Sequence, residues 1–181
     1  MSCLKDKLEL EKFYKFLEEN SIQEKLKNAK VVSINEYYSE FTLDIDSEEF
    51  MFEDFDNYEI FTSGLDFVIK NCKDTVEDFG ISSRFDYDNL WMKEIVCPNL
   101  KKLFIANNFE LTNELLINFA PNLESIEMMS MYFDTLSNKL ESVKVKIWCN
   151  MRFNQETKDI LDEIKKNANY IIDSEVEIDI L

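Results

Sequence analysis

The sequence contains no histidine among its 181 residues. This absence excludes catalysis by Ser-His-Asp or Cys-His systems, and it excludes the common zinc sites that use imidazole ligands. Only two glycines and two prolines are present, and neither G-x-x-x-x-G-K-[ST] nor G-x-G-x-x-G occurs, so the usual nucleotide-binding loops are missing. We therefore expect no enzyme activity, no catalytic residue, no metal site and no cofactor.

Paired cysteines and long apolar runs are also missing. The four cysteines, Cys3, Cys72, Cys97 and Cys149, form no C-x-x-C motif, which indicates reduced thiols. No apolar run approaches the length of a membrane span, and no apolar segment of the kind found in secretory signals follows the first residue. These absences predict a cytoplasmic or nuclear protein that does not contact membranes.

Basic residues are in the minority. The chain has 20 Lys and Arg against 37 Asp and Glu, a net charge of −17. Because phosphate binding depends on Lys and Arg, we expect no nucleic-acid partner. The charge either favours another protein with a basic surface or only keeps the chain soluble. With 45% apolar and 13% aromatic residues, the chain has enough apolar surface for a folded core.

An apolar-x-x-apolar-x-apolar pattern recurs along the chain. Residues 98–105 (PNLKKLFI) and 121–128 (PNLESIEM) are the clearest copies, and residues 76–81 and 140–145 are looser ones. Their first apolar positions are separated by 24, 23 and 17 residues: Val76, Leu100, Leu123 and Leu140. Repetition at a nearly fixed period predicts stacked units of one strand and one helix, with the strands parallel.

Apolar periodicity places the remaining elements. Helical spacing predicts helices at 4–19, 21–29, 63–71, 87–96, 112–119 and 155–167. Ser21 and Glu24 have the spacing of a capping box, and Thr112 is placed to cap its helix. Alternation predicts a hairpin from 41–45 and 50–55, and strands at 76–81, 100–105, 123–128, 140–148 and 170–181. Residues 31–34 fit either a short strand or coil.

Residues 97–108, CPNLKKLFIANN, resemble the C-P-N-L-x-x-L-x-L-x-x-N segment of leucine-rich repeats, most closely the cysteine-containing class of F-box/LRR proteins. Residues 110–116, ELTNELL, are similar to the helix start of that class. The resemblance implies parallel strands on one face and helices on the other. It also implies a substrate-receptor or adaptor role in ubiquitin ligation, although residues 1–40 have neither the opening Leu-Pro nor the closing Trp of an F-box.

These patterns together predict an α/β fold, a short leucine-rich-repeat-like solenoid. We expect residues 1–61 to form a cap of helices and a β-hairpin. Residues 62–181 would form the leucine-rich-repeat-like segment, closed by a C-terminal helix and strand. We expect the two parts to form one continuous domain. Asn107 or Asn108 would bond neighbouring backbone where a strand ends. An irregular α/β domain with two similar units and no solenoid is the alternative.

Two surfaces are candidates for binding a partner. The first is an acidic face without Lys or Arg: Asp44, Asp46, Glu48, Glu49, Glu53, Asp54, Asp56 and Glu59. It does not fit an EF-hand, because position six is Glu49 where glycine is needed and position twelve is Phe55. It would either dock a basic partner or form a solvated hairpin. The second surface is the outward side of the repeat strands: Lys102, Phe104, Ser125, Glu127, Lys144 and Lys146.

The sequence therefore predicts a protein–protein interaction module, with a role related to F-box/LRR ubiquitin-ligase components. The alternative is a stand-alone acidic inhibitor, or antidote-like protein, that neutralises a basic partner. The partner's identity and the oligomeric state are left open.

Overall fold

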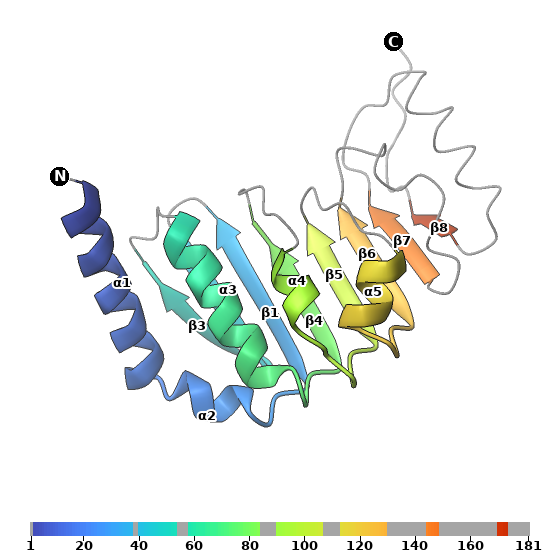
Figure 1. The fold of residues 1–181 in the computed structure, drawn as a ribbon, viewed down its shortest axis with the longest axis horizontal. Coiled ribbons are helices and arrows are strands. Elements are labelled where there is room, and N and C mark those ends of the chain that lie inside the picture. The colour runs from blue at the N-terminus through green and yellow to red at the C-terminus, as the bar shows by residue number, and fades with distance from the viewer. Residues whose placement is uncertain are drawn as a thin grey trace, which may run out of the picture.

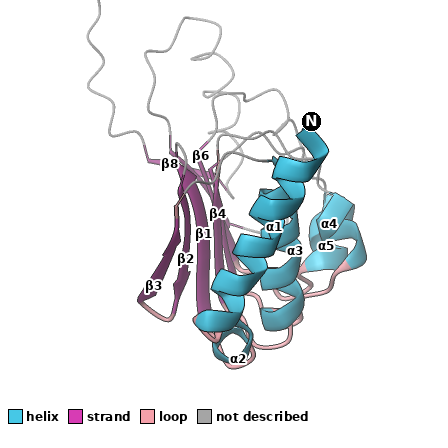
Figure 2. Ribbon diagram, turned by 90° about the vertical axis from the view of Figure 1, so that its left-hand side faces the viewer, coloured by secondary structure: helices cyan, strands magenta, loops and turns pink. Residues whose placement is uncertain are grey.

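One eight-stranded sheet runs through the computed structural model, and the helices that the structure describes lie on one of its two faces (Figures 1 and 2). The structure describes residues 2–37, 40–53, 58–83, 90–106, 113–129, 144–148 and 170–173. Across the sheet the strands follow the order β3 (Glu48–Phe52), β2 (Glu40–Ile45), β1 (Val31–Tyr37), β4 (Asp78–Ser82), β5 (Lys102–Ala106), β6 (Ser125–Met129), β7 (Lys144–Trp148) and β8 (Tyr170–Asp173). The described helices are α1 (Ser2–Glu19), α2 (Ile22–Leu26), α3 (Tyr58–Cys72), α4 (Leu90–Glu94) and α5 (Asn113–Phe119). This mixed arrangement confirms the predicted α/β class.

The N-terminal helices pack on the sheet through their apolar residues. Helix α1 confirms the helix predicted at 4–19, since Phe13 and Leu17 are buried while the Lys and Glu residues on either side of them are exposed. Helix α2 is shorter than predicted, and the predicted capping box is wrong. Ser21 has a left-handed backbone (φ 51°, ψ 35°), and its side chain makes no capping hydrogen bond. Ser21 instead turns the chain between the two helices.

Strands β2 and β3 confirm the predicted hairpin. They pair antiparallel and are joined by Asp46 and Ser47. Both turn residues have positive φ, 49° and 75°, as the two central residues of a tight hairpin turn require. Strand β1, which the sequence left between strand and coil, pairs antiparallel with β2 and parallel with β4. The hairpin therefore extends the same sheet that holds the repeating units.

From β1 and β4 through β8, each strand is parallel to its neighbour. One register line passes through equivalent positions of five strands: Val32, Phe79, Leu103, Ile126 and Val145. In the pattern predicted for the fourth unit, residues 140–145, the equivalent position was Val143. The strand register instead places Val145 there, two residues later. Alternation alone could not detect this error, because a shift of two residues keeps every side chain on the same face.

The strand entries repeat the same backbone geometry. A buried apolar residue comes just before each entry: Ala29, Val76, Leu100 and Leu123. The carbonyl of the following residue accepts two backbone N–H groups of the next unit at 2.8–3.1 Å, in the cases of Lys30, Glu77 and Lys101. Residues 28–34 (NAKVVSI) thus form an additional unit in phase with residues 99–105 (NLKKLFI), which the sequence reasoning missed because a hairpin and a helix separate it from the next copy.

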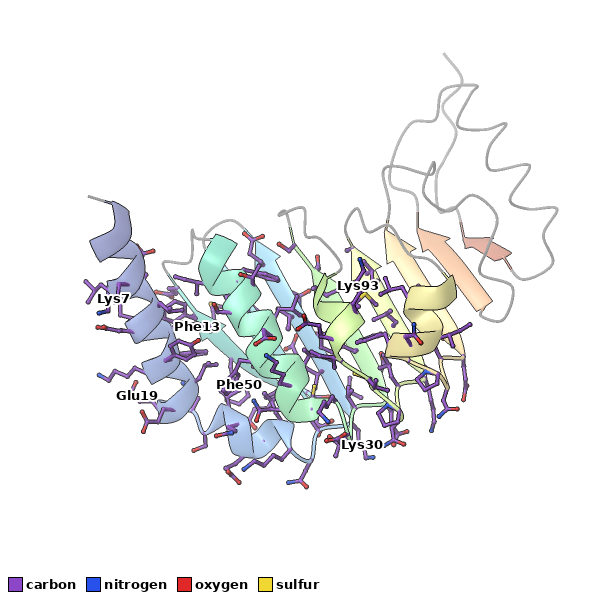
Figure 3. All side chains as sticks on the ribbon, in the orientation of Figure 1. Lys7, Phe13, Glu19, Lys30, Phe50 and Lys93 are labelled. Carbon is purple, nitrogen blue, oxygen red and sulfur yellow. The ribbon has the colours of Figure 1, made fainter. Side chains whose placement is uncertain are left out.

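A continuous hydrophobic cluster extends from α1 to β6 and crosses the predicted boundary between residues 61 and 62. Aromatic rings fill its N-terminal end: the Phe13 ring lies 5.2 Å from that of Phe41 and 5.4 Å from that of Phe52, centroid to centroid. Figure 3 shows Phe13 turned from α1 toward the sheet. A Cβ on Gly64 would approach the Phe13 ring to 2.9 Å, so close packing explains this glycine inside α3.

Some predictions fall on residues outside the described ranges. These are the start of the fourth unit at Leu140, the helix at 155–167, the cap at Thr112, and the backbone contacts of Asn107 or Asn108. Helix α4 is described only as Leu90–Glu94, within the longer helix predicted at 87–96.

Candidate interaction surface

The sheet face opposite the helices is covered by no helix or strand that the structure describes, and we call it the open face (Figure 2). Side chains alternate between the two faces along each strand. In β5, Leu103 and Ile105 are buried under the helices, whereas Lys102 is exposed and Phe104 is partly buried. Lys102 and Phe104 therefore lie on the open face.

The strand registers align open-face residues across the sheet. One such line, which we call the middle row, consists of Glu49, Asp44, Ser33, Gly80, Phe104 and Glu127, from β3 to β6. Neighbouring strands lie about 4.8 Å apart, so the row spans about 24 Å. It contains three carboxylates and one aromatic ring and no basic residue. Lys146 follows in register after Glu127.

The structure brings the predicted strand-face residues onto three neighbouring strands. Lys102 is exposed, and Phe104, Ser125 and Glu127 are partly buried. The remaining two, Lys144 and Lys146, are in β7, in register with Ser125 and Glu127. For these two lysines, the structure describes the backbone but not the side chains.

The predicted acidic face is not continuous, and this prediction is corrected. Asp44 and Glu49 are paired across β2 and β3 on the open face, where Asp44 accepts a hydrogen bond of 2.9 Å from the Ser33 hydroxyl. Glu48 lies on the helix side of the sheet, where its carboxylate is 2.7 Å from Lys25 Nζ. Because neighbouring residues of a strand point to opposite faces, a run of acids in the sequence is divided between two surfaces.

The other predicted acids also have separate locations. Asp46 Oδ1 accepts the backbone N–H groups of Lys30 at 3.0 Å and Val31 at 2.8 Å, which ties the hairpin turn to the start of β1. Glu53 is exposed just after β3. Glu59 is in α3 with its side chain undescribed, and the final two acids lie outside the described residues: Asp54 and Asp56.

Charges of opposite sign alternate at the edge where the parallel strands begin. The Glu77 carboxylate lies 2.9 Å from Lys30 Nζ and 2.9 Å from Lys101 Nζ, so one acid links three units. Figure 3 shows Lys30 at this lower edge. Hydrogen bonds from Lys101 and then Lys30 lower the pKa of Glu77 to about 2, and the bond to Glu77 raises the pKa of Lys101.

We expect the Glu77 carboxylate to stabilise the fold above its ordinary pKa of 4.5 and to lose this contribution as the pH falls toward about 2, its pKa in the folded chain. The stability difference between the wild type and Glu77→Gln should therefore narrow over this interval, as measured by urea unfolding at successive pH values. Lys101→Met should raise the pKa of Glu77, followed by carbon-detected NMR. An ordinary pKa for Glu77 in the wild type would contradict this arrangement.

Two asparagines connect successive units, and the sequence reasoning did not identify them. Asn99 Nδ2 donates to the carbonyl of Asp74 at 2.7 Å, and Asn122 Nδ2 donates to the carbonyl of Pro98 at 2.8 Å. Both follow a proline in the repeated Pro-Asn-Leu sequence. That repetition was the available signal: an amide side chain at the same place in each unit can satisfy backbone of the unit before it.

Asp78 adjoins the middle row on β4, two residues before Gly80. Burial raises the pKa of this carboxyl above its ordinary value, Glu127 raises it further, and Lys102 opposes both. In the strand registers, Asp78 and Glu127 lie in one region of the open face, two strands and two residues apart. This region also contains Phe104.

Among the described residues, Glu36 and Ser83 are the buried polar side chains on the helix side of the sheet. Ser83 donates a hydrogen bond of 2.8 Å to Glu36 Oε2, and both residues are buried. A serine with a carboxylate but no imidazole lacks the usual base of a serine nucleophile. Cys72 and Cys97 are buried free thiols, and burial raises the pKa of both, to about 12 for Cys97, so neither has the character of a reactive thiolate.

Within the described ranges, no group of three or more Cys, Asp or Glu side chains is arranged to hold a metal ion. None of the described helices is long and apolar enough to cross a membrane. No protein-family model, no curated protein and no solved structure matches this chain. The candidate surface therefore has to be judged on its own geometry.

Proposed function

We propose that this chain is a protein-recognition module that binds its partner on the open face of the sheet. The observation that carries the proposal is the distribution of the described helices, which lie on one face of the sheet and leave the other face to side chains. That face exposes Val31 by 50% and Met51 by 45%, and it has an aromatic ring at its centre, Phe104. Exposed apolar groups among polar ones are typical of interaction sites.

The repeating units support a finer proposal, that β4 to β8 form a leucine-rich-repeat-like array. Equivalent positions stand in register, the strand entries repeat the same carbonyl geometry, and Asn99 and Asn122 make equivalent contacts. Stacked units of this kind present a broad surface made of one residue set per strand. Such a surface suits recognition of another protein better than it suits enclosure of a small substrate.

The resemblance of residues 97–116 to F-box/LRR proteins extends the proposal to a substrate receptor or adaptor in ubiquitin ligation. In the structure, the apolar residues Phe13, Leu17, Ile22 and Leu26 of α1 and α2 are buried in the chain's own core. The ubiquitin-ligase role therefore depends on the sequence resemblance alone. Its test is the recovery of Skp1-like and cullin subunits with the tagged chain, and their absence would argue against it.

The open face can be tested with two variants of equal charge. In the first, Glu49 and Glu127 on the open face are changed to Arg; in the second, Glu24 and Glu94 on the helix side are changed to Arg. Affinity purification with quantitative mass spectrometry should recover a partner with the wild type and the helix-side variant. The open-face variant should recover about tenfold less or lower still, as expected for changes inside an interface. Loss of the partner only in the helix-side variant would contradict the proposal.

An acidic inhibitor of a basic protein is the second candidate. The observation that favours it is the excess of acid on the N-terminal half of the open face. Glu40, Glu49, Asp44 and Asp78 lie on β2, β3 and β4, where none of the described open-face residues is basic. Lys102 on the neighbouring strand β5 is in register with Asp78. Electrostatic attraction would then accelerate association with a basic target. Both candidates use the same face, so the partner's chemistry is the question that separates them.

A further inference from the structure

The sheet ends at β3, and one side of this edge strand is paired with no described strand. β3 is last in the strand order and has β2 as its neighbour. In Figure 2, which faces this edge, α1 lies beside β3, and no described helix or strand crosses it. An uncovered edge presents a row of backbone N–H and C=O groups with which another chain can pair.

The hairpin turn determines which backbone groups of β3 face outward. In a two-residue hairpin, the residues that flank the turn exchange backbone hydrogen bonds, and every second pair along the ladder does the same. Ile45 and Glu48 flank the turn, so the next residue of β3 that bonds to β2 is Phe50. Glu49 and Met51 therefore direct their N–H and C=O groups away from the sheet. No described residue outside the strand ladder bonds to these groups.

The opposite side of β2 confirms this phase. The N–H of Asp46 donates to the carbonyl of Val31 at 2.9 Å, so the even-numbered residues of this segment bond toward β1. The odd-numbered residues of β2 then bond toward β3, where their register partners are residues 48, 50 and 52. The backbone groups of residues 49 and 51 are left for the edge.

β3 is held in an extended conformation by its own contacts. The Phe52 ring lies 5.4 Å from the Phe13 ring and 5.4 Å from the Phe16 ring, centroid to centroid. Lys25 Nζ lies 5.3 Å from the centre of the Phe50 ring. The register with β2 continues through all of β3 without a bulge. A segment that joins this edge would meet a preorganised strand, which lowers the entropic cost of binding.

The side chains of β3 select the kind of segment that can pair with it. Natural edge strands are protected by proline, by a bulge or by charged side chains, most often lysine. Residues 48–52, EEFMF, contain no proline, lysine or bulge, and both of their charges are acidic. Glu48 is paired with Lys25 at 2.7 Å, whereas Glu49 is exposed and forms no ion pair with a described residue. Such an edge repels an acidic strand and attracts a basic one.

These charges disfavour a second copy of the chain as the occupant of the edge. Two paired β3 strands would bring two sets of Glu48 and Glu49 together, and like charges on adjacent strands are destabilising. Two chains with a net charge of −17 each also repel one another. A different protein with a basic strand incurs neither cost.

We propose that β3 pairs with an extended basic segment of a partner protein, which joins the sheet as an additional strand. Backbone bonds to Glu49 and Met51 supply affinity, and alternate side chains of the segment supply specificity. Its basic residues would meet Glu49 on the open-face side, and its apolar residues would meet Phe50 and Phe52 on the helix side. This surface is a strand edge, so it goes beyond the open face of the proposed function.

Fluorescence anisotropy with three labelled octapeptides tests the backbone pairing. The first peptide alternates Arg and Val. The second has N-methyl groups on its Arg residues and the third has them on its Val residues, so all three carry the same charge. Because alternate N–H groups of a strand face opposite sides, only one of these sets can face β3. We expect one methylated peptide to bind at least about tenfold more weakly than the first, and the other to bind within about threefold.

Variants of β3 locate the pairing. Met51→Pro removes an outward N–H and leaves the bonds to β2 in place, so binding of the unmethylated peptide should fall at least about tenfold. Met51→Ala keeps this N–H and should change binding by less than about threefold. Glu49→Gln should weaken binding more than Glu94→Gln, which removes the same charge from the helix side. Circular dichroism and urea unfolding check that each variant is folded.

Amide hydrogen exchange followed by NMR provides a measurement that needs no substitution. The N–H groups of Glu49 and Met51 should exchange more slowly when the unmethylated peptide is bound, because they then donate to it. The N–H of Phe50 already faces β2, so its exchange should change less. If Met51→Pro does not fold, this measurement and the methylated peptides decide the question.

Three results would overturn the inference. Equal binding of all three peptides would show general attraction to an acidic chain, which needs no backbone pairing. Unchanged exchange at Glu49 and Met51 in the bound state would place the peptide elsewhere. A dimer of the free chain that Met51→Pro disrupts would assign the edge to a second copy. N-methyl groups change only the peptide backbone, so failure here leaves the open-face interface to the Arg-substitution test described above.

Discussion

Replacement of Phe13 by alanine is expected to lower the free energy of unfolding by about 3–5 kcal/mol. Phe13 is fully buried, and its ring makes edge contacts with Phe41 and Phe52 from two strands of the hairpin. Removal of the ring loses its transfer free energy and leaves a cavity, because Gly64 next to it has no side chain that could fill the space. A loss of this size is a large fraction of the total stability of an ordinary domain.

Urea unfolding monitored by circular dichroism measures this change, and Tyr14→Ala is its control. Tyr14 is the next residue of α1 and is 47% exposed, so its replacement should cost much less. Because the core is continuous from α1 to β6, we also expect Phe13→Ala to shift one cooperative transition. A separate early transition, with the rest of the chain unaffected, would show that α1 and the hairpin are not part of the same core.

Leu103→Ala is expected to cost about 2–5 kcal/mol of unfolding free energy. Leu103 is 1% exposed in the central strand β5, and its register neighbours are Phe79 in β4 and Ile126 in β6. All three are buried under the helices, so the cavity would open in the line of side chains that joins successive units. The sequence alone predicted this residue as a core position of the repeat.

Lys102→Ala is the control for this second prediction. Lys102 precedes Leu103 in the same strand but is exposed on the open face, so we expect a change within about 0.5 kcal/mol. Comparable losses from the two variants would contradict the assigned alternation of β5. The result would then move Phe104 from the open face to the helix side, and the proposed open-face interface would lose its aromatic residue.

The two core predictions and the open-face experiments address different properties of the same sheet. The core variants measure whether the units share one hydrophobic layer on the helix side of the sheet. The surface variants measure whether the opposite, open face binds a partner. With a net charge of −17, the whole chain attracts basic molecules to some extent. Only the comparison of variants at matched charge, Glu49 and Glu127 against Glu24 and Glu94, separates a binding site from this general field.

Local spacing was sufficient to predict much of the fold. The helix at 4–19, the hairpin, and the strands near Leu103 and Ile126 follow from periods of 3.6 and 2, which depend only on nearby residues. The repeated Pro-Asn-Leu sequence likewise predicted equivalent units. Local spacing could not place the fourth unit, where the register moved the equivalent position from Val143 to Val145, because both choices satisfy the same alternation.

The candidate site was less predictable than the fold. The sequence identified Phe104 and Glu127 as outward residues, but it also joined Glu48, Asp46 and Asp44 into one acidic face. The structure separates these three: one pairs with α2 on the helix side, one holds a turn, and one lies on the open face. Acids that are contiguous in the sequence need not share a surface, because successive side chains of a strand point to opposite faces of the sheet.

By itself, the sequence determined the α/β class, the absence of histidine and of glycine-rich nucleotide-binding loops, and the phase of the apolar pattern. These features depend only on composition and on neighbours along the chain. Tertiary structure decided which distant residues meet. It brought Glu77 between Lys30 and Lys101, and it set Gly80 beside Phe104. Parallel stacking places residues of different units one strand apart, and that pairing is fixed by the register of the whole sheet rather than by any local segment.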